Sequence, residues 1–173
     1  MDYVFGNSCS NAFIFKTFGE PLINKALDGY NAVLFMYGQT SSGKTFTLFG
    51  GGSTEGLVGH ALEYIYQSVI NNQDTEYLIK VSYAELYNEE LKDLLSPVPN
   101  ENLKIIDDPM LGPIIQNITQ ENFSTAQNVK DLLKEGENRR HFGVTNMNAH
   151  SSRSHVLVRL NIESRKVRYF IYK

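Results

Sequence analysis

One octapeptide of the chain combines glycine, lysine and hydroxyl residues at a spacing suited to phosphate binding. It follows the pattern GxxxxGK[ST] and reads Gly38-Gln39-Thr40-Ser41-Ser42-Gly43-Lys44-Thr45. Glycines let successive backbone N–H groups point at one anion, Lys44 would supply positive charge to the β- and γ-phosphates, and the Thr45 hydroxyl would bind Mg²⁺. A chain of this length matches the pattern by chance roughly 0.6% of the time at average residue frequencies. The sequence therefore predicts nucleotide binding, although the motif alone identifies neither the base nor the reaction.

A second group of polar residues directly precedes a segment that alternates like a strand, and reads Asn148-Ala149-His150-Ser151-Ser152-Arg153-Ser154-His155. Hydroxyl, amide and guanidinium groups in a loop at a strand edge suit the binding of Mg²⁺ and of a γ-phosphate. Taken alone, however, a serine-rich loop is usually a turn, and a single histidine usually lies on the surface or in a packed contact. This second group indicates a phosphate site only when it is considered together with the phosphate-binding pattern.

The elements that must position the octapeptide can be predicted from the residues around it. Pro21 opens a short helix that ends at Leu27. The apolar run Ala32 to Tyr37 predicts a strand buried on both faces. A brief helix is expected over Phe46 to Leu48, followed by a flexible glycine-rich break at 50–53. Apolar residues at helical spacing then predict a helix over 58–69.

The second half of the chain alternates between short strands and helices. Strands are expected at 77–83, 103–106, 114–118 and 156–162, from alternating or short apolar runs bounded by turn residues. Leu91, Leu94 and Leu95 predict a short helix that stops before Ser96-Pro97. Ser124 and Gln127 form the pattern of a capping box for a helix over 129–133. The chain has no visible internal repeat and no long linker, so a single α/β domain is expected.

Composition excludes several classes of protein. The chain has 173 residues, 42% of them hydrophobic, which is enough to build a core and excludes a disordered chain. The longest apolar run has six residues, whereas a membrane-spanning helix needs about twenty. Cys9 is the single cysteine, so neither an internal disulfide nor a cysteine-based zinc site is predicted. A reducing, intracellular compartment is the expectation.

Charge is distributed unevenly along the chain. The net charge is −3, but all six arginines lie between Arg139 and Arg168. The resulting basic C-terminal third could face an acidic partner, such as nucleic acid, phosphate or an acidic protein surface. A solvated basic face explains the same charge equally well.

The two polar motifs together resemble those of the kinesin motor domain. Further matches to this family occur in the same order along the chain: Tyr30-Asn31, then Ser82-Tyr83-Ala84-Glu85-Leu86-Tyr87-Asn88-Glu89, then Asp93-Leu94-Leu95. The resemblance extends from about Tyr3 to Ser164. Residues 136–143 and 163–165 resemble the centromere-associated kinesin-7 group in particular.

The resemblance implies a fold, a chemistry and a partner. The fold would be a P-loop NTPase-type three-layer α/β sandwich with a central, mostly parallel sheet. ATP would be the nucleotide, Mg²⁺ its cofactor and the microtubule (tubulin) the track, with no nucleic acid or membrane partner. The location would be the cytoplasm, on cytoskeletal microtubules, with the spindle as one candidate site. The oligomeric state is left open because the chain has no coiled-coil pattern.

The resemblance also assigns roles to individual residues. Gly38 to Thr45 would bind the phosphates, with Thr45 on the metal, and Ser152 would be a second Mg²⁺ ligand. Asn148, Ser151 and Arg153 would close over the γ-phosphate and help to order the attacking water. Arg140 would be an electrostatic helper in the preceding segment.

The resemblance further implies that residues 1–173 are a partial motor domain. The family's second switch, Asp-x-x-Gly followed by Glu, does not occur after the 156–162 strand, and the sheet is expected to be incomplete at both ends. Two alternatives to an ATP-driven motor therefore stay open. One is a non-motile fragment with weak or no nucleotide binding, and the other is an unrelated P-loop kinase or ATPase.

Overall fold

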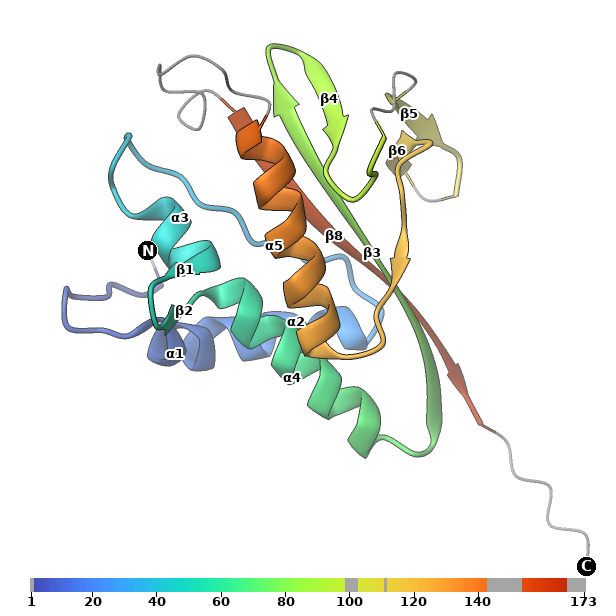
Figure 1. The fold of residues 1–173 in the computed structure, drawn as a ribbon. Coiled ribbons are helices and arrows are strands. Elements are labelled where there is room, and N and C mark those ends of the chain that lie inside the picture. Colours follow the sequence, from blue (N-terminus) through green and yellow to red (C-terminus); the bar gives the residue numbers. More distant parts are fainter. Residues whose placement is uncertain (1, 99–102, 111, 143–153, 168–173) are drawn as a thin grey trace, which may run out of the picture. The chain divides into compact units, whose positions relative to one another are not determined.

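The computed structural model describes residues 2–98, 103–110, 112–142 and 154–167. The chain divides into two compact units. The first contains residues 1–77 together with 164–173, and the second contains residues 78–163. Figure 1 labels the helices and strands of both units.

Helices dominate the first unit. Its first helical stretch comprises α1 (Asn11–Ile14), the π-helical turn η1 (Phe15–Gly19) and α2 (Glu20–Leu27). The Ser10 hydroxyl accepts a hydrogen bond from the Phe13 N–H at 3.2 Å, and this cap explains why the stretch begins there. The predicted helix from Pro21 to Leu27 is confirmed.

The remaining elements of the first unit surround a small apolar core. They are α3 (Lys44–Phe49), β1 (Gly50–Gly51), β2 (Thr54–Glu55) and α4 (Leu57–Asn71). Phe15, Leu57 and Ala61 are buried at the centre of this core. The Tyr64 hydroxyl of α4 donates a hydrogen bond to the Asn24 side chain of α2 at 3.1 Å. Both the brief helix after the phosphate-binding pattern and the longer helix over 58–69 are confirmed.

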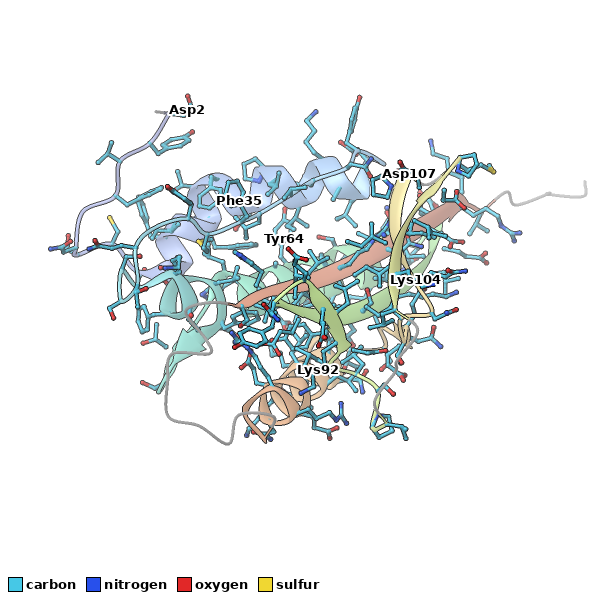
Figure 2. All side chains as sticks on the ribbon, turned by 90° about the horizontal axis from the view of Figure 1, so that it is seen from above. Asp2, Phe35, Tyr64, Lys92, Lys104 and Asp107 are labelled. Carbon is cyan, nitrogen blue, oxygen red and sulfur yellow. The ribbon has the colours of Figure 1, made fainter. Side chains whose placement is uncertain are left out.

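The prediction of a buried strand at Ala32 to Tyr37 is wrong. This segment pairs with no strand among the described residues. Only one face is covered, where Leu34 and Met36 pack against the first unit's core. Val33, Phe35 and Tyr37 are 77%, 75% and 94% exposed, and Figure 2 labels Phe35 on the segment. An apolar run becomes a doubly buried strand only where neighbouring strands and covering layers enclose it.

The glycine-rich break expected at 50–53 is an ordered hairpin. β1 and β2 pair antiparallel, with Gly50 opposite Glu55 and Gly51 opposite Thr54. Gly50 has φ +90°, and a Cβ atom there would collide with the Thr54 carbonyl. Glycine is therefore required for the chain to turn directly from α3 into the hairpin.

A sheet built around one long strand forms most of the second unit (Figure 1). The central strand is β3 (Thr75–Tyr87), which is antiparallel to β4 (Glu90–Asp93) and β7 (Glu121–Asn122) and also pairs with β8 (Ser154–Lys166). A separate antiparallel hairpin comprises β5 (Lys104–Asp108) and β6 (Gly112–Gln116). The strands predicted around residues 77–83, 103–106, 114–118 and 156–162 are all confirmed.

Helix α5 (Ala126–Phe142) covers one face of this sheet. Val129 and Leu133 of the helix are buried, as are Val81 and Tyr83 of β3. The contact is close at Gly136, where an added Cβ atom would lie 2.6 Å from the Tyr83 ring. A larger residue at this helix position would therefore force the helix away from the sheet.

The short helix predicted from Leu91, Leu94 and Leu95 is wrong. Asn88 and Glu89 both have positive φ, and they form the turn that folds β4 back onto β3. The chain then bends, because the Asp93 carboxylate accepts hydrogen bonds from the Leu95 and Ser96 N–H groups at 2.9 and 3.2 Å. Leu94 and Leu95 are buried and Leu91 is half-buried through this hairpin and bend, so their spacing does not reflect a helix.

The capping box predicted at Ser124 and Gln127 is displaced by one residue. The Thr125 hydroxyl accepts the hydrogen bond from the Asn128 N–H at 3.0 Å, and α5 begins at Ala126. Gln127 instead donates to the Asp131 carboxylate. The helix itself is confirmed, as is the mixed α/β class. The central sheet was predicted to be mostly parallel. The pairs of β3 with β4 and of β3 with β7 are both antiparallel.

Candidate nucleotide site

The loop from Gly38 to Gly43 links the extended segment to helix α3 in the first unit. Gly38, Ser41 and Gly43 have φ angles of +157°, +64° and +90°. Positive φ at several positions within six residues curls the backbone, a conformation that an anion-binding loop uses to direct N–H groups at a ligand. A Cβ atom at Gly43 would meet no atom within 4 Å, so open space adjoins the loop at this point.

The Lys44 side chain folds back over this loop. Its ammonium donates hydrogen bonds to the Gly38 carbonyl at 2.7 Å and to the Gln39 carbonyl at 2.6 Å. Within the part of the chain that the structure describes, no carboxylate lies at ion-pair distance from it. The ammonium therefore contacts neutral carbonyl oxygens and no carboxylate among the described residues. Its positive charge is thus available to the oxygens of a bound phosphate.

The Thr45 side chain lies in the first turn of α3 and is exposed. Hard oxygen ligands such as this hydroxyl are what Mg²⁺ prefers, together with phosphate oxygens and water. Among the described residues no cluster of three or more histidine, cysteine, aspartate or glutamate side chains could hold a metal by itself. The curled loop and the Lys44 ammonium suit a phosphate group, and the Thr45 hydroxyl is an oxygen ligand of the kind that Mg²⁺ takes.

Asn11 fixes the helix that carries Lys44 and Thr45. Its side chain is only 5% exposed, and its amide donates to the carbonyl of Phe46 in α3 and to that of Glu55 in β2, both at 3.1 Å. The amide thereby joins α1, α3 and the hairpin within the first unit. Sequence reasoning missed this residue, because an asparagine next to a capping serine carries no signal of a distant partner.

The four residues predicted to sense the γ-phosphate and the metal lie outside the described residues. They are Asn148, Ser151, Ser152 and Arg153. Ser154 is the first described residue after them and begins β8. Their predicted roles consequently stay predictions.

Arg140, the predicted electrostatic helper, is buried in a cluster of polar side chains in the second unit. We call this group the Arg140 cluster; it consists of Tyr83, Glu85, Glu137, Arg140 and Ser154. The Arg140 guanidinium contacts the Glu85 carboxylate at 2.9 Å and the Glu137 carboxylate at 3.2 Å. The Tyr83 hydroxyl donates to Glu137 at 2.6 Å. Arg140 is thus engaged by two carboxylates.

The surroundings shift the pKa values of two members of the Arg140 cluster. Burial, the hydrogen bond to Glu137 and the negative charge of Glu137 all raise the pKa of Tyr83 far above its ordinary value. Burial alone would lower the pKa of Arg140, but the hydrogen bond to Glu85 and the charge of Glu137 outweigh it and raise that pKa. Tyr83 is therefore neutral and Arg140 charged throughout the physiological range.

None of the helices in the described part of the chain combines the length and apolarity that crossing a membrane requires.

Comparisons with known proteins show which family the chain belongs to. The family model for the kinesin motor domain matches residues 1–169. The chain is 42% identical to kinesin-like protein KIN-7N of Arabidopsis thaliana over 164 residues, covering 95% of this chain and 20% of that protein. It is also 42% identical to KIN-7L of Oryza sativa subsp. japonica over 163 residues, covering 94% of this chain and 25% of that protein. Both relatives bear the name of the kinesin-7 group, as the resemblance predicted.

A solved structure of a fast kinesin has the same fold. It superimposes with a TM-score of 0.89 at 32% sequence identity and covers 96% of this chain. This chain spans 48% of the solved kinesin chain and a fifth to a quarter of the two plant relatives. On the match over residues 1–169, the chain belongs to the kinesin motor domain family.

Proposed function

We propose that this chain is the ATP-binding part of a microtubule motor, and that its Gly38–Thr45 loop binds the phosphates of ATP with Mg²⁺. The Lys44 ammonium carries this proposal, because it lies over a curled loop and is held there by two carbonyls. Phosphate oxygens can replace those neutral acceptors and make charge-assisted hydrogen bonds. The exposed Thr45 hydroxyl would then complete the coordination of Mg²⁺.

The residues just before β8 would act on the terminal phosphate. Ser152 would be a second ligand of Mg²⁺, while Asn148, Ser151 and Arg153 would contact the γ-phosphate and order the attacking water. Their residue types support this assignment, because hydroxyl and amide groups bind metal and water, and a guanidinium stabilises charge on a transferring phosphoryl group.

Nucleotide titration tests the binding step. A fluorescent ATP analogue should bind the wild-type chain in the presence of Mg²⁺, and Lys44→Ala should weaken binding by about tenfold or more, because a charge-assisted contact is lost. Lys16→Ala is the matched control, since Lys16 is an exposed lysine on the helical stretch of the same unit. Equal binding by Lys44→Ala and wild type would contradict the assignment of the loop.

The proposed partner is the microtubule. The solved relative is described in terms of its ATPase mechanism and its interactions with microtubules, and family membership supports the same track for this chain. The corresponding location is on cytoskeletal microtubules in the cytoplasm, with the spindle as one candidate site. ATP turnover should rise on addition of polymerised tubulin, and Lys44→Ala should abolish that rise.

A non-motile fragment with weak or no nucleotide binding is the second candidate function. Val33, Phe35 and Tyr37 favour it, because they expose apolar surface on a segment that pairs with no described strand. In that case the fluorescent ATP analogue would bind weakly or not at all, and ATP turnover would be the same with and without microtubules. The two titrations together distinguish the motor from the fragment.

A further inference from the structure

The guanidinium of Arg140 is fixed by three separate partners within the second unit. Its Nε donates to Glu85 of β3 at 2.9 Å, its Nη1 to Glu137 of α5 at 3.2 Å, and its Nη2 to the Ser154 hydroxyl of β8 at 2.8 Å. Each nitrogen thus has its own acceptor. Because the guanidinium is planar and rigid, three acceptors in different directions leave it one orientation.

These contacts join the end of one element to the beginning of another. Arg140 lies in the last turn of α5, which ends at Phe142, and Ser154 is the first residue of β8. The two carboxylates hold the cation from β3 and from α5, and the cation in turn holds the Ser154 hydroxyl. Arg140 and Ser154 are side chains of low to intermediate exposure, so water competes weakly for this hydrogen bond.

We infer that Arg140 is a positioning residue, which holds Ser154 and through it sets the start of β8. This inference rests on the proposed function, because the residues assigned there to the terminal phosphate and the metal directly precede Ser154 in the chain. Arg140 acts through Ser154, because its own charge is committed to Glu85 and Glu137. Its effect should therefore appear for a nucleotide that has a γ-phosphate and not for one that lacks it.

Ser154→Ala is the most selective test, because it removes one hydroxyl and leaves both ion pairs of Arg140 in place. Amide hydrogen exchange should accelerate at residues 154–158 and stay unchanged in α4, which belongs to the first unit. The ratio of affinities for a non-hydrolysable ATP analogue and for ADP should fall about tenfold, the loss expected for one hydrogen bond from a charged group. Ser154→Thr retains a hydroxyl and should restore both values toward wild type.

Arg139→Lys provides a matched control from the neighbouring position. Arg139 donates to the Leu94 and Leu95 carbonyls beyond β4 and not to β8, so this variant should leave exchange at residues 154–158 unchanged. Arg140→Lys should behave like Ser154→Ala, because one ammonium cannot face three acceptors in the orientation of the guanidinium.

The two readouts separate this inference from the function on which it rests. Unchanged exchange at residues 154–158 in Ser154→Ala would show that the hydrogen bond does not hold β8, and would overturn the inference. Faster exchange with an unchanged affinity ratio would limit Arg140 to a structural role and would also overturn it. If the wild-type chain binds neither nucleotide, the proposed function fails, while exchange still decides whether Arg140 holds Ser154.

Discussion

Two cations of this chain are held in opposite ways. Lys44 begins α3, and its ammonium lies over the preceding loop with two neutral carbonyl partners, whereas Arg140 is buried between two carboxylates and a hydroxyl. A cation with neutral partners can exchange them for an anionic ligand at small cost. A buried cation paired with carboxylates cannot leave them without exposing uncompensated charge. The contrast separates a residue suited to binding a ligand from one suited to fixing the fold.

The largest effect should come from breaking the buried pair. Glu85→Gln removes the charge that faces Arg140 at 2.9 Å, where both side chains are less than 10% exposed. Loss of one partner of a buried ion pair should lower the free energy of unfolding by about 3 kcal/mol, because the remaining charge keeps its desolvation cost. Urea denaturation followed by circular dichroism measures this change.

A surface ion pair on the same helix provides the control. Glu135 contacts Arg139 at 3.2 Å, but its side chain is 63% exposed. Glu135→Gln should therefore change the free energy of unfolding by less than about 1 kcal/mol. Equal losses in the two variants would mean that the Arg140 cluster contributes no more than an exposed pair, and the contrast with Lys44 would lose its basis.

The next largest loss of stability should come from removing Asn11, which holds the helix that follows the loop from Gly38 to Gly43. Asn11→Ala removes the buried amide that donates to the Phe46 and Glu55 carbonyls. Both carbonyls would lose a partner, so the free energy of unfolding should fall by about 2 kcal/mol. ATP affinity should also fall, since α3 carries Lys44 and Thr45. Asn128 is an exposed asparagine in the first turn of α5 and accepts one surface hydrogen bond from Ser124, so Asn128→Ala should change the free energy of unfolding by less than about 0.5 kcal/mol and leave the affinity unchanged.

Asn11 also shows why only part of this site could be predicted. The octapeptide was identified because its chemistry is local: glycines, lysine and threonine must be consecutive in the chain to surround one phosphate. Asn11 acts on carbonyls 35 and 44 residues away. A backbone carbonyl has the same chemistry in every residue, so no sequence pattern marks it as the acceptor.

The same distinction separates the correct and incorrect predictions of secondary structure. Helix α4 and strand β8 were predicted from the periodicity of their own residues, because each buries one face regularly. The segment from Ala32 to Tyr37 was predicted as a doubly buried strand, but burial on both faces depends on other segments that pair with it and cover it. The short helix predicted from Leu91, Leu94 and Leu95 was wrong for a similar reason. The Asn88–Glu89 turn and Asp93 determine the path of the backbone there.

A smaller effect should appear at alkaline pH in the Arg140 cluster. The pKa of Tyr83 is raised in the folded chain, while in the unfolded chain it is about 10. Above about pH 10 the folded state therefore keeps a proton that the unfolded state releases, so this contribution to stability is present below pH 10 and falls as the pH rises. The loss should approach about 1.4 kcal/mol per pH unit.

Tyr83→Phe removes the hydroxyl that titrates, so the free energy of unfolding should decline less steeply above about pH 10. The quantity to compare is the difference in unfolding free energy between wild type and Tyr83→Phe, measured at pH 8 and at pH 11, because the other tyrosines contribute equally to both proteins. The advantage of wild type should shrink by about 1.4 kcal/mol between the two pH values. A difference independent of pH would show that the Tyr83 hydroxyl is neither buried nor bound to Glu137 as the structure places it.

The smallest effect on stability should follow from Lys44→Ala, although this variant has the greatest expected effect on nucleotide binding. The hydrogen bonds of Lys44 to the Gly38 and Gln39 carbonyls lie in an exposed loop, where water can replace the ammonium as the donor. The free energy of unfolding without nucleotide should therefore change by less than about 0.5 kcal/mol.

With saturating ATP and Mg²⁺, wild type should gain stability in proportion to the logarithm of the nucleotide concentration, whereas Lys44→Ala should gain little. Thermal denaturation over a series of ATP concentrations measures both quantities in one experiment. A large loss of stability in the absence of nucleotide would place Lys44 with Arg140 among the residues that fix the fold, and the distinction between the two cations would then disappear.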